Sequence, residues 1–486
     1  MKTVKDLLFG VQIESVQGGT EVMVDALAFD SRKVTAQTLF VAIKGEAFDG
    51  HDFIDQAIAN GASVIVCETK PQTVLEGVVW IVVKNTRKAL AIVASHFFDN
   101  PSKKIKLVGV TGTNGKTSVT TLLYTLFLHL GYPVGLLSTI AVKYNGLSFS
   151  ATHTTPDPIQ INARLAEMVQ NGVEYCFMEV SSHGIAQERT EGLVFAGGVF
   201  TNLTHDHLDY HGSFAAYRDV KKQFFDHLPA TAFALTNIDD KNGDYMLQNC
   251  QAQKRSYALK NYGDYTAKIL EKNFEGMLLS MSNQELWTAL VGSFNASNLL
   301  AVYGVAQQLG VDKQTALTAL SVLKNVDGRF ETILTPNKAI VIVDYAHTPD
   351  ALKNVLQTIA DIRTRNEVLT TVVGCGGNRD VEKRPLMAQA AVQMSDQVIL
   401  TSDNPRNEDP EKILDEMEAG ISPDQSRKTL RITDRKFAIK AACTRLNPAD
   451  ILLIAGKGHE KFQEVKGIKT PFDDIALVKE FCKTLA

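Results

Sequence analysis

Short runs of apolar and β-branched residues alternate with longer stretches of helical periodicity along almost the whole chain, and this alternation restricts the fold more than any other feature. The clearest runs cover residues 63–66, 78–83, 106–110, 194–201, 339–344, 368–374, 397–401 and 450–455. Strands that are apolar throughout and are separated by helices are typical of parallel sheets with helices on both faces. The pattern therefore predicts an α/β protein.

A chain of 486 residues is too long for one ordinary hydrophobic core, so several domains are expected. Two polar stretches that contain proline, 100–104 and 334–338, interrupt the alternation and are candidate linkers. They divide the chain into domains at 1–104, 105–335 and 336–486, each of ordinary domain size.

The composition is that of a globular protein in a reducing compartment. Apolar residues make up 45% and charged residues 21% of the chain, and 50 Lys and Arg face 54 Asp and Glu for a net charge of -4. This balance does not favour nucleic-acid binding. The 6 cysteines form no C-x-x-C pair, the N-terminus lacks a secretory signal pattern, and no apolar run approaches the roughly 20 residues that span a bilayer. We expect a cytoplasmic monomer without a nucleic-acid or membrane partner.

A glycine-rich turn, V-G-V-T-G-T-N-G-K-T-S at 108–118, joins an apolar strand to a helical segment. In such a turn backbone N–H groups converge on phosphate oxygens, and the helix N-terminus adds a partial positive charge. Lys116 can then reach the terminal phosphates, and the Thr117 hydroxyl can coordinate Mg²⁺. The general Walker A pattern has glycine where this chain has Val110. The alternative is a tight strand-to-helix turn with a capping threonine.

Acidic and histidine residues follow two further apolar runs. Glu179 ends the run 175–178, and three histidines and two aspartates lie within 205–211, after the run 194–201. Ligands bind at the carboxyl ends of strands in open α/β sheets, and carboxylate oxygens suit Mg²⁺. A single histidine is usually structural, but a cluster at a strand end favours a functional site. The H-E-x-x-H spacing of zinc proteases is absent.

Together these motifs resemble those of the Mur ligases, ATP-dependent amide ligases whose relatives include the folylpolyglutamate synthetases. The similar segments are T-G-T-N-G-K-T at 111–117, M-E-V-S-S-H at 178–183, N-x-x-x-D-H-x-D-x-H-G at 202–212 and D-Y-A-H-T-P at 344–349. The resemblance extends through all three expected domains in order. It implies an N-terminal UDP-binding α/β domain, a central P-loop ATPase-like parallel-sheet domain and a C-terminal Rossmann-like domain that binds the amino acid.

The resemblance also implies a catalytic centre that uses ATP and Mg²⁺. Thr117, Glu179 and His207 would be Mg²⁺ ligands, and Lys221 would carry a carbamate, with Lys222 as the alternative position. Carbamylation replaces an ammonium cation with a carboxylate that can bind or orient a metal. The implied catalytic residues are Lys116, Glu179, His207, Lys221 and Arg329.

Several segments would form the ATP site by the same resemblance. The implied contacts are Gly112, Thr113, Asn114, Gly115, Lys116, Thr117, Ser118, Asn295, Asn298, Arg329 and Asp344. Arg329 would contact the phosphates, for which the fixed charge and planar donors of arginine are well suited. Asn295 and Asn298 could instead cap the start of a helix.

By the same resemblance, two further regions would bind the acceptor substrate, UDP-N-acetylmuramoyl-L-alanyl-D-glutamate. Ser31 and the segment 46–48 would contact the UDP group in the first domain. The muramoyl-peptide would be bound by Thr154, Thr155, Ser181, Gln187 and Arg189.

The segment D-N-P-R at 403–406 concerns the amino acid that is added. In the family it is found where meso-diaminopimelate is the substrate. This amino acid has a carboxylate at the end of its side chain, where lysine has none, and a guanidinium such as Arg406 can bind that carboxylate bidentately. The other implied contacts are Arg379, Asp403, Asn404, Pro405, Gly456 and Glu460.

The expected reaction is ATP-dependent addition of meso-diaminopimelate through an acyl phosphate, in the synthesis of peptidoglycan precursors. Three alternatives stay open at this point. The same ligase could add L-lysine, the chain could be another Mur or folylpolyglutamate-type ligase, or it could be a non-catalytic ATP-binding regulatory protein.

Overall fold

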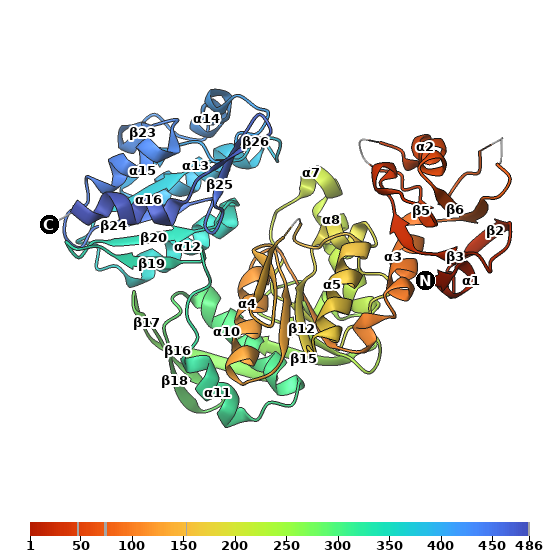
Figure 1. The fold of residues 1–486 in the computed structure, drawn as a ribbon. Helices are drawn as coiled ribbons and strands as arrows, with labels where there is room; N and C mark the ends of the chain where they lie inside the picture. The colour runs from red at the N-terminus through yellow and green to blue at the C-terminus, as the bar shows by residue number, and fades with distance from the viewer. Residues whose placement is uncertain (46–47, 72–74, 152, 485–486) are drawn as a thin grey trace.

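The computed structural model describes residues 1–45, 48–71, 75–151 and 153–484, so the expected UDP contacts at 46 and 47 lie outside it. Within these ranges the strands form three large sheets of 5, 11 and 6 strands and two 2-stranded pairs. The three large sheets follow one another along the molecule, with the N-terminal sheet at one end and the C-terminal sheet at the other (Figure 1). The α/β class expected from the alternating pattern is confirmed.

The N-terminal sheet has the order β2-β7-β6-β5-β4. Its strands are β2 (Ile13–Gln17), β7 (Val79–Val83), β6 (Ala62–Cys67), β5 (Thr38–Val41) and β4 (Ala26–Ala28). All neighbours pair in parallel except β2, which pairs with β7 in the antiparallel direction. Helices α2 (Ile54–Ala59) and α3 (Thr86–Phe97) contribute to two separate apolar clusters, one on each face of the sheet.

The centre of the second sheet is parallel and has the order β9-β12-β8-β13-β14-β15. These strands are β9 (Val134–Leu137), β12 (Tyr175–Glu179), β8 (Lys106–Thr111), β13 (Gly197–Phe200), β14 (Phe233–Asn237) and β15 (Gln253–Ala258). Helices α4 (Lys116–His129) and α10 (Ser293–Gln308) share one apolar cluster with it, and α5 (Pro158–Gln170) and α8 (Phe214–Asp226) share the other. Because β8 lies between β12 and β13, the segments after these three strands meet at one edge.

Further strands extend this sheet at both ends, which the alternating pattern did not predict. They are β10 (Ala141–Tyr144) and β11 (Leu147–Ser150) at one end, and β16 (Tyr265–Asn273), β17 (Gly276–Met281) and β18 (Gln284–Thr288) at the other. β16 pairs with β15 in parallel, and the other added pairs are antiparallel. Strands β11, β16 and β18 are partly exposed, so they lack the continuous apolar runs of the parallel strands.

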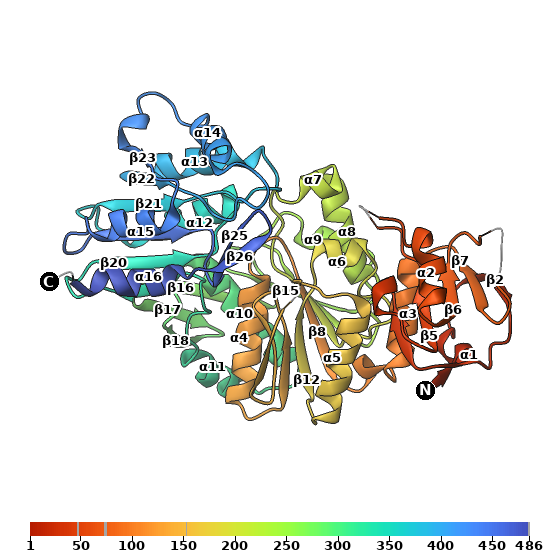
Figure 2. The same ribbon diagram turned by 45° about the horizontal axis from the view of Figure 1, so that its top comes forward.

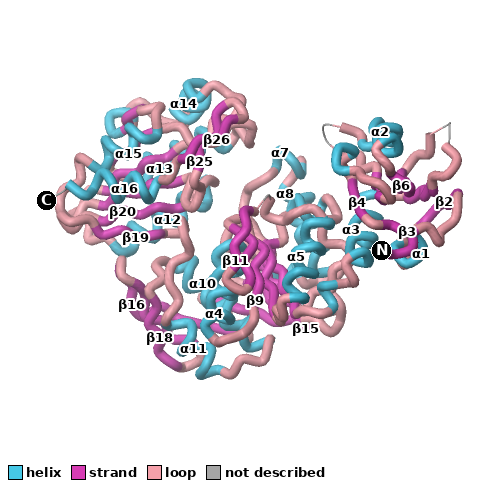
Figure 3. The backbone as a smooth tube through the Cα atoms, in the orientation of Figure 1, coloured by secondary structure: helices cyan, strands magenta, loops and turns pink. Residues whose placement is uncertain are grey.

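The C-terminal sheet has the order β19-β20-β24-β21-β22-β23. Its strands are β19 (Glu331–Leu334), β20 (Ile340–Asp344), β24 (Ile451–Ala455), β21 (Leu369–Val373), β22 (Gln397–Leu400) and β23 (Thr429–Arg431). Helices α12 (Pro349–Ile362), α13 (Lys383–Met394) and α14 (Pro410–Glu418) cover one face, and α15 (Arg435–Cys443) and α16 (Asp474–Phe481) the other (Figure 3). A hairpin of β25 (Phe462–Val465) and β26 (Ile468–Pro471) lies beside them.

Strand β19 pairs with β20, so the third sheet begins at Glu331, ahead of the linker expected at 334–338. The C-terminal unit and the central unit lie side by side, and loops of both face the space between them (Figure 2). In the described part of the chain, no helix is long and apolar enough to cross a membrane.

Candidate functional site

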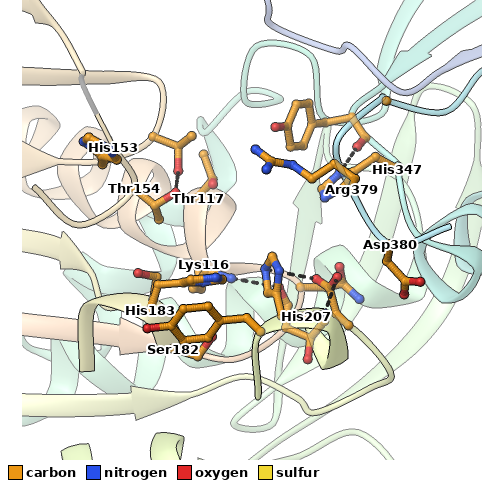
Figure 4. A pocket seen from close by; sticks show the side chains of 18 of the residues that line it. Lys116, Thr117, His153, Thr154, Ser182, His183, His207, His347, Arg379 and Asp380 are labelled. Carbon is orange, nitrogen blue, oxygen red and sulfur yellow. Dashed lines mark hydrogen bonds and ion pairs between the residues drawn. The ribbon is translucent and has the colours of Figure 1, made fainter. Parts of the chain in front are cut away.

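A cavity of about 670 Å³, called the central cavity below, lies where the central and C-terminal units meet. The central unit contributes the loop after β8, the end of β12, the histidine-rich segment after β13 and part of α8. The C-terminal unit contributes the segments that follow β20, β21, β22 and β24. Figure 4 shows Lys116, Thr154 and His207 of the central unit around the same space as His347, Arg379 and Asp380 of the C-terminal unit.

The glycine-rich loop between β8 and α4 needs its glycines for steric reasons. Gly112 has φ +149°, and a Cβ added there would lie 2.0 Å from the Thr201 hydroxyl oxygen. Gly115 has φ +88°, and its Cβ would lie 2.8 Å from Oδ1 of Asn298. The ammonium of Lys116 folds back over the loop and donates to the carbonyl oxygens of Gly112 at 2.9 Å and Thr113 at 2.8 Å. The loop thus has the compact backbone that phosphate binding requires.

Glu179, at the end of β12, is a buried carboxylate beside this loop. It accepts hydrogen bonds from the Ser138 hydroxyl at 2.6 Å, the Thr139 backbone N–H at 2.8 Å and the Thr117 hydroxyl at 3.0 Å. All of these donors are neutral, so they orient the carboxylate, and the charge of Lys116 acts on it through space. A buried carboxylate next to a threonine hydroxyl is an oxygen donor set that fits Mg²⁺.

His207 follows β13 in the left-handed conformation, with φ +55°. Its Nε2 lies 3.4 Å from Oδ2 of Asp206, and its ring centroid lies 4.8 Å from that of His183. Burial lowers the pKa of His207 to about 3. The imidazole is therefore neutral near pH 7, which is the form that binds a metal.

The two candidate lysines on α8 have different surroundings. Lys221 is buried, and its ammonium donates to the Gly112 carbonyl oxygen at 2.9 Å. Burial lowers the pKa of Lys221, and the nearby charge of Lys116 lowers it further. Lys222 instead forms an ion pair with Asp226 at 2.7 Å. Since CO₂ reacts with an uncharged amine, the environment of Lys221 favours carbamylation and that of Lys222 does not.

Arg329 lies two residues before β19, at the junction with the C-terminal unit, and contacts the phosphate loop. Its Nη2 donates to the Thr117 hydroxyl at 3.2 Å, and its guanidinium lies 4.4 Å from the ring centroid of Tyr345. Its Nε is buried and has no hydrogen-bond partner among the described residues. The carboxylate of Asp344 accepts from the Phe330 backbone N–H at 2.7 Å and so fixes the segment that carries Arg329. An arginine with an unused donor beside a phosphate loop can bind an anion.

A second pocket of about 340 Å³ lies on the other side of the phosphate loop. The expected ATP contacts that line it are Asn114, Gly115, Ser118, Asn298, Arg329 and Asp344. Asn295 lies behind Asn298, whose Nδ2 donates to Oδ1 of Asn295 at 3.2 Å, while Nδ2 of Asn295 donates to the Val291 carbonyl oxygen at 2.9 Å. Asn295 therefore orients Asn298.

The expected muramoyl-peptide residues gather on the side of the central cavity that faces the N-terminal unit. Thr154, Thr155, Ser181, Gln187 and Arg189 all line the cavity. Thr155 organises them, because its hydroxyl donates to the Glu179 carbonyl oxygen and accepts from the Ser181 backbone N–H, both at 2.9 Å. Arg189 donates to the Thr155 carbonyl oxygen at 2.5 Å and to Oε1 of Gln187.

Ser31 lies apart from this group, in the N-terminal unit. It is buried, and its hydroxyl donates to Oε1 of Gln56 at 2.8 Å.

The expected amino-acid residues line the opposite side of the cavity. Nη1 of Arg406 donates to the Gly377 carbonyl oxygen at 2.7 Å, and its Nε lies 3.9 Å from the Glu464 carboxylate. Nδ2 of Asn404 donates to Oε2 of Glu460 at 2.8 Å. Pro405 is buried between these residues. A Cβ on Gly456 would lie 2.6 Å from Oδ2 of Asp403, so the segments after β22 and β24 approach closely.

Each of the three units matches a family model of the Mur ligases. The chain matches the descriptions "Mur ligase family, catalytic domain" over 24–98, "Mur ligase middle domain" over 110–306 and "Mur ligase, glutamate ligase domain" over 328–458. The chain belongs to the Mur ligase family. The three-unit α/β architecture is that of this family.

Relatives of this Mur ligase include a "UDP-N-acetylmuramoyl-L-alanyl-D-glutamate--2,6-diaminopimelate ligase" of Cytophaga hutchinsonii, which is 51% identical over 99% of both chains. A protein of the same name from Geobacillus kaustophilus is 40% identical over 94% of both chains. A solved structure with that name matches with a TM-score of 0.70 and 31% identity, over 100% of this chain and 99% of the other. A MurF ligase of Thermotoga maritima, solved with ADP, shares the fold at a TM-score of 0.63 and 20% identity, over 96% of this chain and 98% of the other.

Two further residues of this Mur ligase line or support the cavity and were not expected from the sequence. Lys457 is fully buried and donates to Oδ1 of Asn404 at 2.9 Å and to Oε2 of Glu460 at 2.8 Å. Lys383 lines the cavity and donates to the His347 carbonyl oxygen at 3.1 Å. Lys457 lies between Gly456 and Glu460, which were both expected to contact the amino acid. This position was the sequence signal that could have identified it.

Proposed function

We propose that this chain is an ATP-dependent ligase that adds meso-diaminopimelate to UDP-N-acetylmuramoyl-L-alanyl-D-glutamate in the synthesis of peptidoglycan precursors. The observation that carries the proposal is that Lys116 and Arg406, from two units of a Mur ligase, line the same cavity. Relatives that are 51% and 40% identical over nearly the full chain bear this substrate pair in their names.

The first step activates a carboxylate. The side-chain carboxylate of the D-glutamate residue attacks the γ-phosphorus of ATP, the bond to the bridging oxygen breaks, and an acyl phosphate and ADP form. Lys116 and Arg329 stabilise the charge on the transferred phosphoryl group, because both cations are held at the phosphate loop. The adenosine part of ATP occupies the second pocket, beside Ser118 and Asn298.

Thr117, Glu179 and His207 are the residues that would hold Mg²⁺, with a carbamate on Lys221 as a further anionic group. Bound Mg²⁺ neutralises the charge of the phosphates and polarises them. The structure supports this donor set by its buried, orienting hydrogen bonds to Glu179. In the described ranges no cluster of three His, Cys, Asp or Glu side chains could hold a metal ion by itself.

The second step forms the amide. The amine of meso-diaminopimelate attacks the carbonyl carbon of the acyl phosphate, and inorganic phosphate leaves. Arg406 binds the side-chain carboxylate of the amino acid, Arg379 binds a second carboxylate, and Glu460 pairs with an ammonium group. The ammonium of lysine would meet Arg406 with like charge, which disfavours lysine.

We also propose a separate binding role for each of the three units. Residues 1–104 bind the UDP group, 105–330 bind ATP, and 331–486 bind the amino acid, since β19 belongs to the third sheet. The protein acts as a monomer in the cytoplasm.

Phosphate release tests the proposed reaction. ATP and UDP-N-acetylmuramoyl-L-alanyl-D-glutamate are supplied with meso-diaminopimelate, L-lysine or L-glutamate, and inorganic phosphate is measured. We expect meso-diaminopimelate to stimulate phosphate release at least 100-fold more than lysine. Preference for lysine would contradict the amino-acid assignment, and no stimulation by any amino acid would favour a non-catalytic ATP-binding protein.

A further inference from the structure

The two arginines of the amino-acid side lie on different loops that share one buried support. Arg379 lies in the segment after β21, and Arg406 in the segment after β22. Below both segments, Arg384 of α13 is fully buried, with 0% of its side chain exposed. A buried guanidinium requires anionic partners, because desolvation of an unpaired charge costs several kcal/mol.

Arg384 has two such partners. Its Nη1 lies 2.9 Å from the Glu408 carboxylate and 2.5 Å from the Glu416 carboxylate. Glu408 follows Arg406 by two residues, whereas Glu416 lies within α14, which packs on α13. The side chains of Glu408 and Glu416 are similarly buried, with exposed fractions of 25% and 28%. The two carboxylates therefore differ mainly in their position in the fold.

Glu408 also holds the loop that carries Arg379. Its Oε1 accepts from Nη2 of Arg384 at 3.0 Å and from the backbone N–H of Asn378, the residue before Arg379. Nη2 of Arg384 additionally reaches the Gly376 carbonyl oxygen at 3.5 Å. One carboxylate therefore joins the buried arginine to both loops.

Further contacts make this junction short and rigid. The Asn407 backbone N–H donates to Oδ1 of Asn378 at 3.1 Å, and the Gly377 N–H donates to the Asn404 carbonyl oxygen at 2.9 Å. A Cβ on Gly377 would lie 2.0 Å from the Pro405 carbonyl oxygen, so the two backbones are nearly in contact. The distance between the Arg379 and Arg406 loops depends on this junction.

We propose that Arg384 and Glu408 are positioning residues that fix the spacing of Arg379 and Arg406 and thereby set the affinity for an amino acid with two carboxylates. The inference rests on the proposed function. Neither residue touches the substrate, and their effect passes through the backbone of Asn378 and the Arg406 segment. A site with two anion-binding groups needs them held within about 0.5 Å of the productive geometry.

Paired variants test the proposal in the full-length protein. Glu408→Gln removes the negative charge that pairs with Arg384 and leaves an amide oxygen in its place. Glu416→Gln makes the same change at the other partner of this arginine, which contacts neither loop. We expect Glu408→Gln to raise the KM for meso-diaminopimelate at least tenfold, with the KM for ATP unchanged within twofold. Glu416→Gln should leave both KM values within twofold. The melting temperatures of the two variants should fall by similar amounts, because each loses one charged partner of Arg384.

Equal KM values for the two variants would overturn the positioning role and leave only a structural one. If Glu408→Gln does not fold, Glu408→Asp replaces it, because the shorter side chain cannot reach Arg384 and Asn378 together. An unchanged KM for meso-diaminopimelate in that variant would also overturn the role. The wild-type protein separates this result from failure of the proposed function, which would appear as no phosphate release with any amino acid.

Discussion

Replacement of Arg406 by alanine is expected to raise the KM for meso-diaminopimelate steeply and to leave the KM for ATP within twofold. The guanidinium is 23% exposed and is held by Gly377, so it is preorganised for a carboxylate. Loss of one partner of a hydrogen-bonded charge pair costs about 2–3 kcal/mol at a partly buried site, which corresponds to roughly 30- to 150-fold. Steady-state kinetics with each substrate varied in turn measure both values.

A matched control is Arg363→Ala. Arg363 is also an arginine of the C-terminal unit and pairs with Asp396 at 2.7 Å, but it does not line the central cavity. Its removal should leave the kinetics of meso-diaminopimelate within twofold. If Arg406→Ala behaves like Arg363→Ala, the proposed contact with the side-chain carboxylate is wrong, and the ligase assignment is unaffected.

Replacement of Lys221 by alanine should lower kcat at least 1000-fold, because it would remove the carbamate proposed to complete the anionic centre at the phosphate loop. Short carboxylates such as formate should restore part of the activity, since they can occupy the space that the lysine vacates. Lys221 is buried and its nitrogen lies 2.9 Å from the Gly112 carbonyl oxygen, so the vacated space adjoins the loop. Phosphate release with and without added formate measures the rescue.

Lys222→Ala is the control on the same helix. Lys222 pairs with Asp226 at 2.7 Å, so its loss should reduce stability more than activity, and formate should have no effect. Full activity of Lys221→Ala, or equal loss in both variants, would remove the carbamate from the proposed mechanism.

Local sequence was sufficient for the elements that carry the site. The apolar runs at 106–110 and 450–455 became β8 and β24 because residues buried on both faces of a sheet must be apolar throughout. The glycine-rich turn was equally clear, since only glycine tolerates the backbone at Gly112 and Gly115. The strands β16 and β18 were missed because each is half exposed and carries no continuous apolar run.

The choice between neighbouring residues needed the tertiary structure. Lys221 and Lys222 are adjacent on α8, and only the packing of this helix against the phosphate loop shows which nitrogen reaches Gly112. Asn295 and Asn298 are likewise equivalent in sequence, but one lines the second pocket and the other supports it.

The alternating strands and helices, the phosphate-binding turn and the chemical groups that follow each strand could be predicted from local patterns, because they depend on residues close together in the chain. The folded chain was needed to show that β8 lies between β12 and β13, that Arg329 reaches Thr117, and that Arg384 supports two loops. These contacts join residues distant in sequence. Their geometry follows from the order of the strands and the packing of the helices, which no local pattern contains.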